Sequence, residues 1–323
     1  MAARVRPRPP ASALPWRVMA TDVAITGDRP CGQRTHTAKV WDGEFCGAGV
    51  TQDRGSAKNA AFVAITESHP MTRATSKTPT GKPLVIAVAG RKGGVGKTTV
   101  AGGLASILHA QKQRVLAIDL DPQSNLAFGL GADPNPRGQT TVEFLLQMHP
   151  TPQTIAPGFD VFAGNQGLTG QQIQDLHPED LADLVAHVPY DIVVLDCPPG
   201  NERLEFQAIA AADVAFVVLD AHPYAIVGAQ RVHKTLQDTH QKGRRGPSPE
   251  RWAFVMSRLD GRRAADRDLP AFLDKHYPSV KQFPMRQDAA LAAASTEGRP
   301  VMDACPEARG VEDLKVIAKW VRR

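Results

Sequence analysis

From residue 82 onward, short apolar runs alternate with longer stretches whose apolar residues recur at helical spacing. The runs predicted as strands are residues 84–90, 114–120, 160–163, 190–196, 213–219, 252–257 and 280–283. Helices are expected at residues 98–111, 140–148, 170–187, 203–211, 225–240, 264–276, 286–296 and 310–321. Apolar strands that alternate with helices indicate a mostly parallel sheet covered on both faces. We therefore expect a doubly wound α/β domain, a mostly parallel sheet flanked by helices, over residues 81–323.

The first 80 residues have a different composition. Arginines alternate with prolines at their start, and only short apolar pieces follow. Residues 76–81 have the Ser, Thr, Pro and Gly content of a linker. We expect residues 1–80 to form a basic, proline-containing and largely disordered extension. In an alternative interpretation, translation naturally begins at Met71 and the preceding residues are not native sequence.

The bulk composition is that of an ordinary soluble protein, with 42% hydrophobic and 22% charged residues. No stretch approaches 18 uninterrupted apolar residues, so we expect no membrane span and no stable membrane insertion. The four cysteines form no C-x-x-C pair. Their spacing indicates neither a zinc site nor a disulfide framework, and it favours a reducing cytoplasm.

The net charge of +5 is unevenly distributed. Residues 1–80 contain 11 Lys and Arg against 6 Asp and Glu, whereas residues 81–323 contain 27 of each kind. Within this neutral part, residues 231–286 contain 13 basic against 6 acidic side chains. Such a local excess suits contacts with nucleic-acid phosphates, and solvated loop charge is the alternative. The candidate DNA contacts are Lys242, Arg244, Arg245, Arg258, Arg262 and Arg263.

A glycine-rich run joins the first predicted strand to the first predicted helix. It reads Lys92-Gly93-Gly94-Val95-Gly96-Lys97-Thr98-Thr99. In such a loop, backbone N–H groups and the positive end of the helix bind phosphates. We expect Lys97 to reach the β- and γ-phosphates of a nucleotide, and the hydroxyl of Thr98 to bind Mg²⁺. Arg91 replaces the usual first glycine of this pattern, and Lys92 is an additional lysine within the loop.

Acidic side chains end two of the predicted strands. Asp119 and Asp121 lie where the second strand leaves the sheet, and Asp196 follows four apolar residues in a later strand. The carboxyl ends of parallel strands share one edge of a sheet, so all three should face the glycine-rich loop. A carboxylate at such a strand end can hold Mg²⁺, which makes Asp196 and Asp119 candidate ligands. Asp121 is a candidate for positioning an attacking water; turn or helix-capping roles are the alternative for Asp119 and Asp121.

Three motifs in this order resemble the ParA/Soj/MinD family of deviant Walker A ATPases, over roughly residues 82–323. They are the loop of residues 92–99, the run Asp119-Leu120-Asp121-Pro122-Gln123 and the run Asp196-Cys197-Pro198-Pro199-Gly200. The resemblance implies a P-loop NTPase fold, ATP and Mg²⁺ as ligands, and a face-to-face dimer of two ATP-bound subunits. It also implies that Lys92 reaches the partner's phosphates and that Asp121 orients the lytic water.

Two positions depart from the usual pattern of this family. The family often has Asn at the end of the strand predicted at residues 252–257, where that residue contacts adenine. Ser257 stands there, which leaves its role as a nucleotide contact open. Cys197 replaces a residue that is commonly Thr, and we expect it to be a small buried side chain.

The resemblance leaves two main functions. One is a partner-stimulated ATPase that binds double-stranded DNA nonspecifically and segregates plasmids or chromosomes with a ParB-like centromere-binding protein. Such a protein is cytoplasmic and associated with the nucleoid. The alternative is a MinD-like positioning ATPase, which needs an amphipathic membrane-binding tail. Residues 311–323 are amphipathic, but their place in the last expected helix favours packing against the core. We therefore predict the partition ATPase.

Overall fold

The computed structural model describes residues 81–322, so the extension expected at residues 1–80 lies outside the described residues. An eight-stranded sheet runs through this part of the chain, with the strand order β3-β4-β2-β5-β1-β6-β7-β8. The strands are β1 Leu84–Ala89, β2 Val115–Asp119, β3 Gln153–Ala156, β4 Phe159–Phe162, β5 Ile192–Asp196, β6 Val214–Leu219, β7 Trp252–Leu259 and β8 Lys281–Arg286.

All neighbouring strands of this sheet are parallel except β3 and β4. β3 runs antiparallel to β4 because only two residues, Pro157 and Gly158, connect the strands, whereas a parallel connection needs a dozen residues or more. β1, β2, β5 and β6 are buried almost throughout, which explains their continuous apolar sequences.

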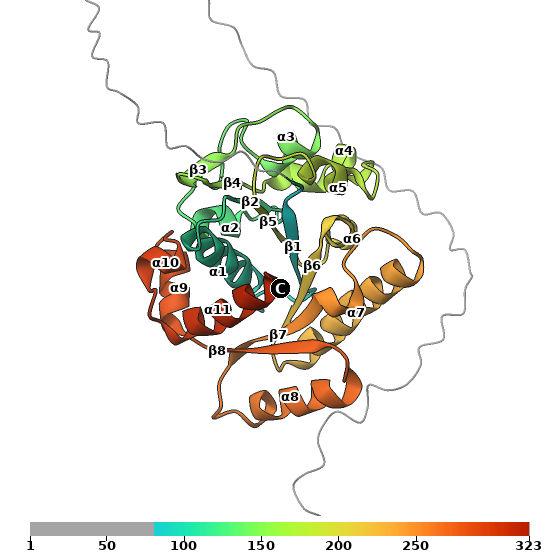
Figure 1. Ribbon diagram of the computed structural model, residues 1–323, viewed down its shortest axis with the longest axis vertical. Helices are drawn as coiled ribbons and strands as arrows, with labels where there is room; N and C mark the ends of the chain where they lie inside the picture. Colours follow the sequence, from blue (N-terminus) through green and yellow to red (C-terminus); the bar gives the residue numbers. More distant parts are fainter. Residues whose placement is uncertain (1–80, 323) are drawn as a thin grey trace, which may run out of the picture. The chain divides into compact units, whose positions relative to one another are not determined.

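Helices cover both faces of the sheet (Figure 1). α1 packs with α9, α10 and α11 on one face, and α6 and α7 lie on the other. This arrangement confirms the predicted doubly wound fold. The helices are α1 Lys97–Ala110, α2 Asn125–Gly129, α3 Thr141–Leu145, α4 Gln171–Gln174, α5 Asp180–Val185, α6 Glu202–Ala211, α7 Pro223–Gln241, α8 Ala264–His276, α9 Ala289–Thr296, α10 Val301–Ala304 and α11 Arg309–Val321.

Some predicted element boundaries were wrong, and the reasons are local. The helix expected at 170–187 is divided into α4 and α5, because Pro178 cannot donate a backbone hydrogen bond and disfavours helix at the residue before it. β8 continues to Arg286, so the next helix begins only at Ala289. There the carboxylate of Asp288 accepts the backbone N–H of Ala290 at 2.8 Å and caps the helix. The edge strand β3 was not predicted.

The apolar face of α11 is part of the domain core. Leu314 and Ile317 are fully buried, and Trp320 packs on the rings of Phe216 and Phe283 at 5.7 and 5.5 Å between centroids. This supports the expectation that the helix packs against the core, and it leaves the apolar face of α11 unavailable to a membrane. In the part of the chain that the structure describes, no helix is long and apolar enough to cross a membrane.

Candidate nucleotide-binding site

The glycine-rich loop lies between the central strand β1 and α1. Gly96 is the N-cap of α1 and has a φ of 94°, a left-handed conformation that glycine adopts without strain. Lys97 begins the helix, and its side chain is folded back into the loop with only 6% exposed. Its Nζ donates to the carbonyl of Lys92 at 3.3 Å. The loop therefore surrounds the ammonium group that is expected to meet the phosphates.

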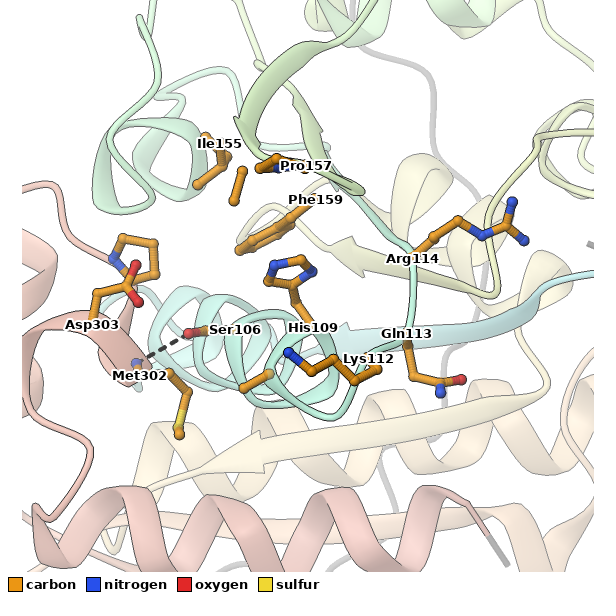
Figure 2. A pocket seen from close by; sticks show the side chains of 13 residues that line it. Ser106, His109, Lys112, Gln113, Arg114, Ile155, Pro157, Phe159, Met302 and Asp303 are labelled. Carbon is orange, nitrogen blue, oxygen red and sulfur yellow. Dashed lines mark hydrogen bonds between the residues drawn. The ribbon is translucent and has the colours of Figure 1, made fainter. Parts of the chain in front are cut away.

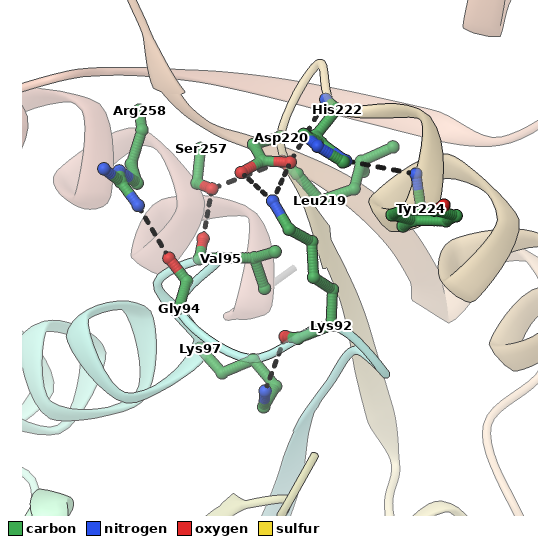
Figure 3. Close-up of polar contacts among 10 residues, drawn as sticks. All are labelled: Lys92, Gly94, Val95, Lys97, Leu219, Asp220, His222, Tyr224, Ser257 and Arg258. Atoms are coloured by element: carbon green, nitrogen blue, oxygen red, sulfur yellow. Dashed lines mark hydrogen bonds and ion pairs between the residues drawn. The ribbon is translucent and has the colours of Figure 1, made fainter. Parts of the chain in front are cut away.

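The end of β7 fastens the loop from a distant part of the chain (Figure 3). The hydroxyl of Ser257 hydrogen-bonds the carbonyl of Val95 and also lies 3.2 Å from the carbonyl of Leu219. Arg258 has a left-handed backbone with a φ of 58°, and its guanidinium donates to the carbonyl of Gly94 at 2.8 Å. Ser257 is 2% exposed. It thus contacts the backbone of the loop, and Arg258 holds the exposed tip.

Two carboxylates meet at the carboxyl ends of neighbouring strands. Asp119 in β2 is paired in register with Asp196 in β5, and both side chains are buried. Burial raises the pKa of Asp196 to about 7, while the adjacent Thr98 hydroxyl and the Lys97 ammonium act in the opposite direction. Burial, and then the charge of Asp196, raise the pKa of Asp119 well above its usual range.

The two carboxylates differ in what they bind. Asp119 accepts backbone N–H groups, from Asp121 at 3.0 Å on one oxygen and from Leu126 at 2.8 Å on the other. It therefore holds the chain that leaves β2 and the start of α2. Neither carboxylate oxygen of Asp196 meets a donor at good hydrogen-bond geometry within residues 81–322, although both are buried and the Thr98 hydroxyl is close enough to lower the pKa. A buried polar group without a partner is costly, so this carboxylate is the one free to accept a ligand.

These residues fit a magnesium ion that is bound together with a nucleotide. No group of three or more His, Cys, Asp and Glu in the described domain forms a metal site by itself. Mg²⁺ commonly takes one or two protein oxygens and completes its shell with phosphate oxygens and water. Asp196 offers two unpartnered oxygens, and the Thr98 hydroxyl lies beside it at the start of α1.

Asp121 follows β2 on the same edge of the sheet. It is partly exposed, and its Oδ1 accepts the backbone N–H of Gln123 at 3.0 Å. The partly exposed side chain of Asp121 can still meet solvent. Gly164 packs closely on this turn, because a Cβ there would lie 1.9 Å from the carbonyl oxygen of Asp121. Only glycine allows that approach.

Lys92 has a partner within its own subunit. Its Nζ lies 2.9 Å from Oδ2 of Asp220, the residue that follows β6 (Figure 3). Asp220 was not among the residues selected from the sequence. Its position after an apolar run is the only signal that could have found it, because carboxyl ends of strands in this sheet collect functional side chains.

Arg91 joins the loop to the first turn of α6. Its guanidinium donates twice to Oε1 of Glu205, at 3.1 and 3.0 Å, and also contacts Glu202. The Glu205 side chain is only 2% exposed, and its burial raises its pKa despite the adjacent guanidinium. The residue that replaces the usual glycine is therefore one half of a buried ion pair. No local sequence pattern indicates this pair.

The candidate DNA-binding residues form two separate groups. Lys242, Arg244 and Arg245 are exposed and follow α7, at the edge where β7 begins. Arg245 is paired with Asp183, and the guanidinium of Arg244 lies 5.8 Å from the ring centre of Phe206. This first group lies at the amino ends of the strands, on the edge opposite the phosphate loop.

The second group lies at the carboxyl edge: Arg258 is near the end of β7, and Arg262 and Arg263 follow the strand. All three are exposed. Arg262 forms an ion pair with Asp260 at 2.7 Å, which neutralises part of the local charge. Since β7 separates the two groups, the structure does not bring the six residues into one patch. The second group shares its edge with the candidate nucleotide site.

A cavity of about 430 Å³ lies elsewhere, between the end of α1, the β3–β4 hairpin and α10 (Figure 2). The ring of His109 stacks on Phe159 inside it, with 5.3 Å between the ring centres. None of the residues expected to bind phosphate or Mg²⁺ lines this cavity. Its position at the far end of α1 separates it from the phosphate loop.

The glycine-rich loop after a central parallel strand, with a carboxylate at the end of the adjacent strand, defines a P-loop nucleotide-binding protein. The family described as an AAA domain matches residues 84–246, about half of the chain. The chromosome partitioning protein ParA of Caulobacter vibrioides is 32% identical over 235 residues, which cover 68% of this chain and 86% of that protein. The chromosome-partitioning ATPase Soj of Thermus thermophilus is 31% identical over 240 residues, which cover 73% and 94%. The chain belongs to the ParA/Soj/MinD-type P-loop ATPases.

Solved structures share this fold. A Cyanothece McdA–ATP complex superposes with a TM-score of 0.66 at 21% identity, covering 75% of this chain and 97% of that one. MinD of Pyrococcus horikoshii, complexed with Mg-ADP, gives a TM-score of 0.60 at 22% identity and covers 75% and 96%. At these identities the likeness concerns the fold.

Proposed function

We propose that this protein is an ATP-dependent dimerising ATPase that binds DNA nonspecifically and acts in plasmid or chromosome partition. The observation that carries the proposal is the buried, unpartnered carboxylate of Asp196 beside the loop that contains Lys97 and Thr98. This combination suits a nucleoside triphosphate bound with Mg²⁺. The partition role is supported by the names of the curated relatives, ParA and Soj.

The phosphates would lie along the loop, where backbone N–H groups and the start of α1 face them. Lys97 would then exchange its contact with the Lys92 carbonyl for the β- and γ-phosphates. Thr98 and Asp196 would hold Mg²⁺, which when bound neutralises charge on the phosphate oxygens. We assign Asp119 a supporting role, because backbone N–H groups occupy its oxygens.

Hydrolysis requires a water in line with the γ-phosphate. Asp121 is the partly exposed carboxylate on the same edge, and we propose that it orients this water. Lys92 would cross to the phosphates of the second subunit and stabilise the charge that develops there. Dimerisation and nucleotide state are then coupled, because neither subunit has a complete site alone.

We propose that the second basic group contacts DNA phosphates. Arg258, Arg262 and Arg263 lie on the edge that also carries the nucleotide site, so dimerisation would place two copies of the group near one another. Lys242, Arg244 and Arg245 stay candidates on the opposite edge. A ParB-like protein would stimulate turnover, and the protein would be cytoplasmic and associated with the nucleoid.

Cosedimentation with long DNA, and separately with liposomes, tests this function. We expect DNA binding with ATP and Mg²⁺ but not with ADP, with affinity that falls steeply as salt increases. Binding to vesicles without binding to DNA would refute the proposal and favour a MinD-like protein.

Three variants test the assigned residues. Lys97→Ala should abolish ATP binding, whereas Lys92→Ala should spare binding and abolish dimer formation and hydrolysis. Asp121→Ala should bind ATP, dimerise and stay on DNA, because only the water loses its orientation. Normal hydrolysis by Asp121→Ala would show that its assigned role is wrong.

A further inference from the structure

Lys92 and Asp220 form an ion pair in which the lysine Nζ contacts both carboxylate oxygens. The Nζ of Lys92 lies 2.9 Å from Oδ2 and 3.2 Å from Oδ1 (Figure 3). β6 is hydrogen-bonded to β1, so the residue after β6 comes to lie beside the loop that follows β1. The two side chains are 28% and 18% exposed, which shields the pair partly from water.

The carboxylate of Asp220 is held in place without Lys92. Its Oδ1 accepts the backbone N–H of His222 at 3.2 Å, in the turn that leads into α7. His222 is the N-cap of that helix, and its ring nitrogen accepts the backbone N–H of Tyr224. The position of the carboxylate is therefore fixed by the start of α7, and Lys92 binds to a group that is already in place.

The main chain of the loop is held by contacts that do not involve Lys97, because Ser257 binds the carbonyl of Val95 and Arg258 that of Gly94. The side chain of Lys92 can therefore change partner without rearranging the loop. A phosphate of a second subunit and the carboxylate of Asp220 are both anions, and both require the same ammonium group. The phosphate and the carboxylate of Asp220 therefore compete for Lys92.

We propose that Asp220 is a positioning residue that keeps Lys92 within its own subunit and thereby opposes ATP-dependent dimerisation. The inference rests on the proposed function, in which Lys92 acts across the dimer interface. Subunits associate when the phosphates of the partner's ATP attract Lys92 more strongly than Asp220 does. The ion pair thus sets the protein concentration at which ATP produces dimers.

The expected effect follows from the exposure of the pair. An ion pair that is partly shielded from water changes an equilibrium by about threefold to tenfold. Each dimer releases two pairs, one from each subunit, so the factors multiply. Removing the charge of Asp220 should lower the dimer Kd by about 10-fold to 100-fold.

The test compares full-length wild type with Asp220→Asn in sedimentation-velocity titrations with a slowly hydrolysed ATP analogue and Mg²⁺. Asparagine keeps an oxygen that can accept the His222 N–H, so the turn into α7 should persist. Asp220→Glu restores the negative charge and should return the Kd toward the wild-type value. Nucleotide affinity, measured at protein concentrations where all variants are monomeric, should not change.

Asp191→Asn provides a matched control. Asp191 forms an ion pair with Arg114 at 2.7 Å and accepts the backbone N–H of the same residue, before β5 at the opposite edge of the sheet. Its replacement removes one negative charge and one comparable pair without touching Lys92. It should leave the dimer Kd within about twofold of wild type.

Tighter dimerisation of Asp220→Asn, reversed in Asp220→Glu and absent in Asp191→Asn, supports the inference. If wild type dimerises with the analogue and Asp220→Asn has the same or a higher dimer Kd, the inference is overturned and the proposed function stays intact. If wild type binds the analogue and both proteins stay monomeric at every concentration, ATP-dependent dimerisation is refuted, and the role of Asp220 with it.

Discussion

The ion pair between Arg91 and Glu205 permits a quantitative prediction. Arg91 packs closely on Gly228 of α7, because a Cβ added to Gly228 would lie 3.3 Å from the Cβ of Arg91. Arg91→Met largely keeps the methylene stem, so this contact should remain. The two hydrogen bonds to Glu205 are lost. Since the Glu205 side chain is 2% exposed and that of Arg91 15%, the values for buried pairs apply. The change should lower the free energy of unfolding by about 3–5 kcal/mol at pH 8.

The effect should depend on pH in a definite direction. Burial already raises the pKa of Glu205, and the removal of Arg91 withdraws the charge that opposes this rise. In the variant, folded Glu205 therefore binds a proton over a pH range where unfolded glutamate has lost it. Stability of the variant falls as the pH rises through this range. The deficit relative to wild type should be smaller at pH 5.5 than at pH 8.

Urea denaturation followed by circular dichroism measures these differences, and the melting temperature should fall by about 10 °C at pH 8. The double variant Arg91→Met/Glu205→Met is the control, because it removes both charges. It should lie within about 1.5 kcal/mol of wild type. A loss below about 1 kcal/mol in Arg91→Met at pH 8, or a deficit that grows on acidification, would refute the reasoning.

Three further predictions concern other parts of the domain. Gly103→Ala should lower the free energy of unfolding, measured in urea, by about 1–3 kcal/mol, because the added Cβ would lie 2.5 Å from Leu314. Gly102→Ala in the same helix is the control and should stay within about 1 kcal/mol of wild type. Burial lowers the pKa of His233, so on acidification this residue is protonated in the unfolded chain before it is protonated in the folded protein. The stability of wild type should therefore fall as the pH drops below about 6.5, and His233→Phe should reduce that fall. Ser257→Ala should weaken ATP and GTP binding by a similar factor, about threefold to tenfold, in nucleotide titrations; a loss confined to ATP would instead indicate a contact with adenine.

The sequence was sufficient for the architecture because strands buried on both faces are nearly continuous apolar runs. β1, β5 and β6 are such strands, and each was expected within a few residues of its observed position. The glycine-rich loop was also predictable, since its conformation depends on adjacent residues such as Gly96. Short, half-exposed elements were not, as the edge strand β3 and the division of one expected helix at Pro178 show.

The contacts that hold the site could not be predicted, because they join residues far apart in the chain. Lys92 and Asp220 are separated by 128 positions, and Ser257 lies 162 positions after Val95. Such pairs become neighbours only through the strand order, which places β6 beside β1 and β7 beside β6. The same reason applies to the basic residues: the sequence shows a local excess of positive charge, but only the strand order shows that β7 places the two groups on opposite edges of the sheet.

The contacts around the loop differ in a way that bears on switching. Ser257 and Glu205 are each about 2% exposed, and they hold the loop at Val95 and Arg91 through groups that no longer meet water. Breaking either one leaves a buried polar group unsatisfied, so nucleotide binding should leave both intact. The pair made by Lys92 is more exposed, at 28% for the lysine, so exchanging its partner costs less than breaking either buried contact. A loop held rigidly at its backbone, with one charged side chain free to exchange partners, can report the state of a second subunit without rebuilding its own phosphate site.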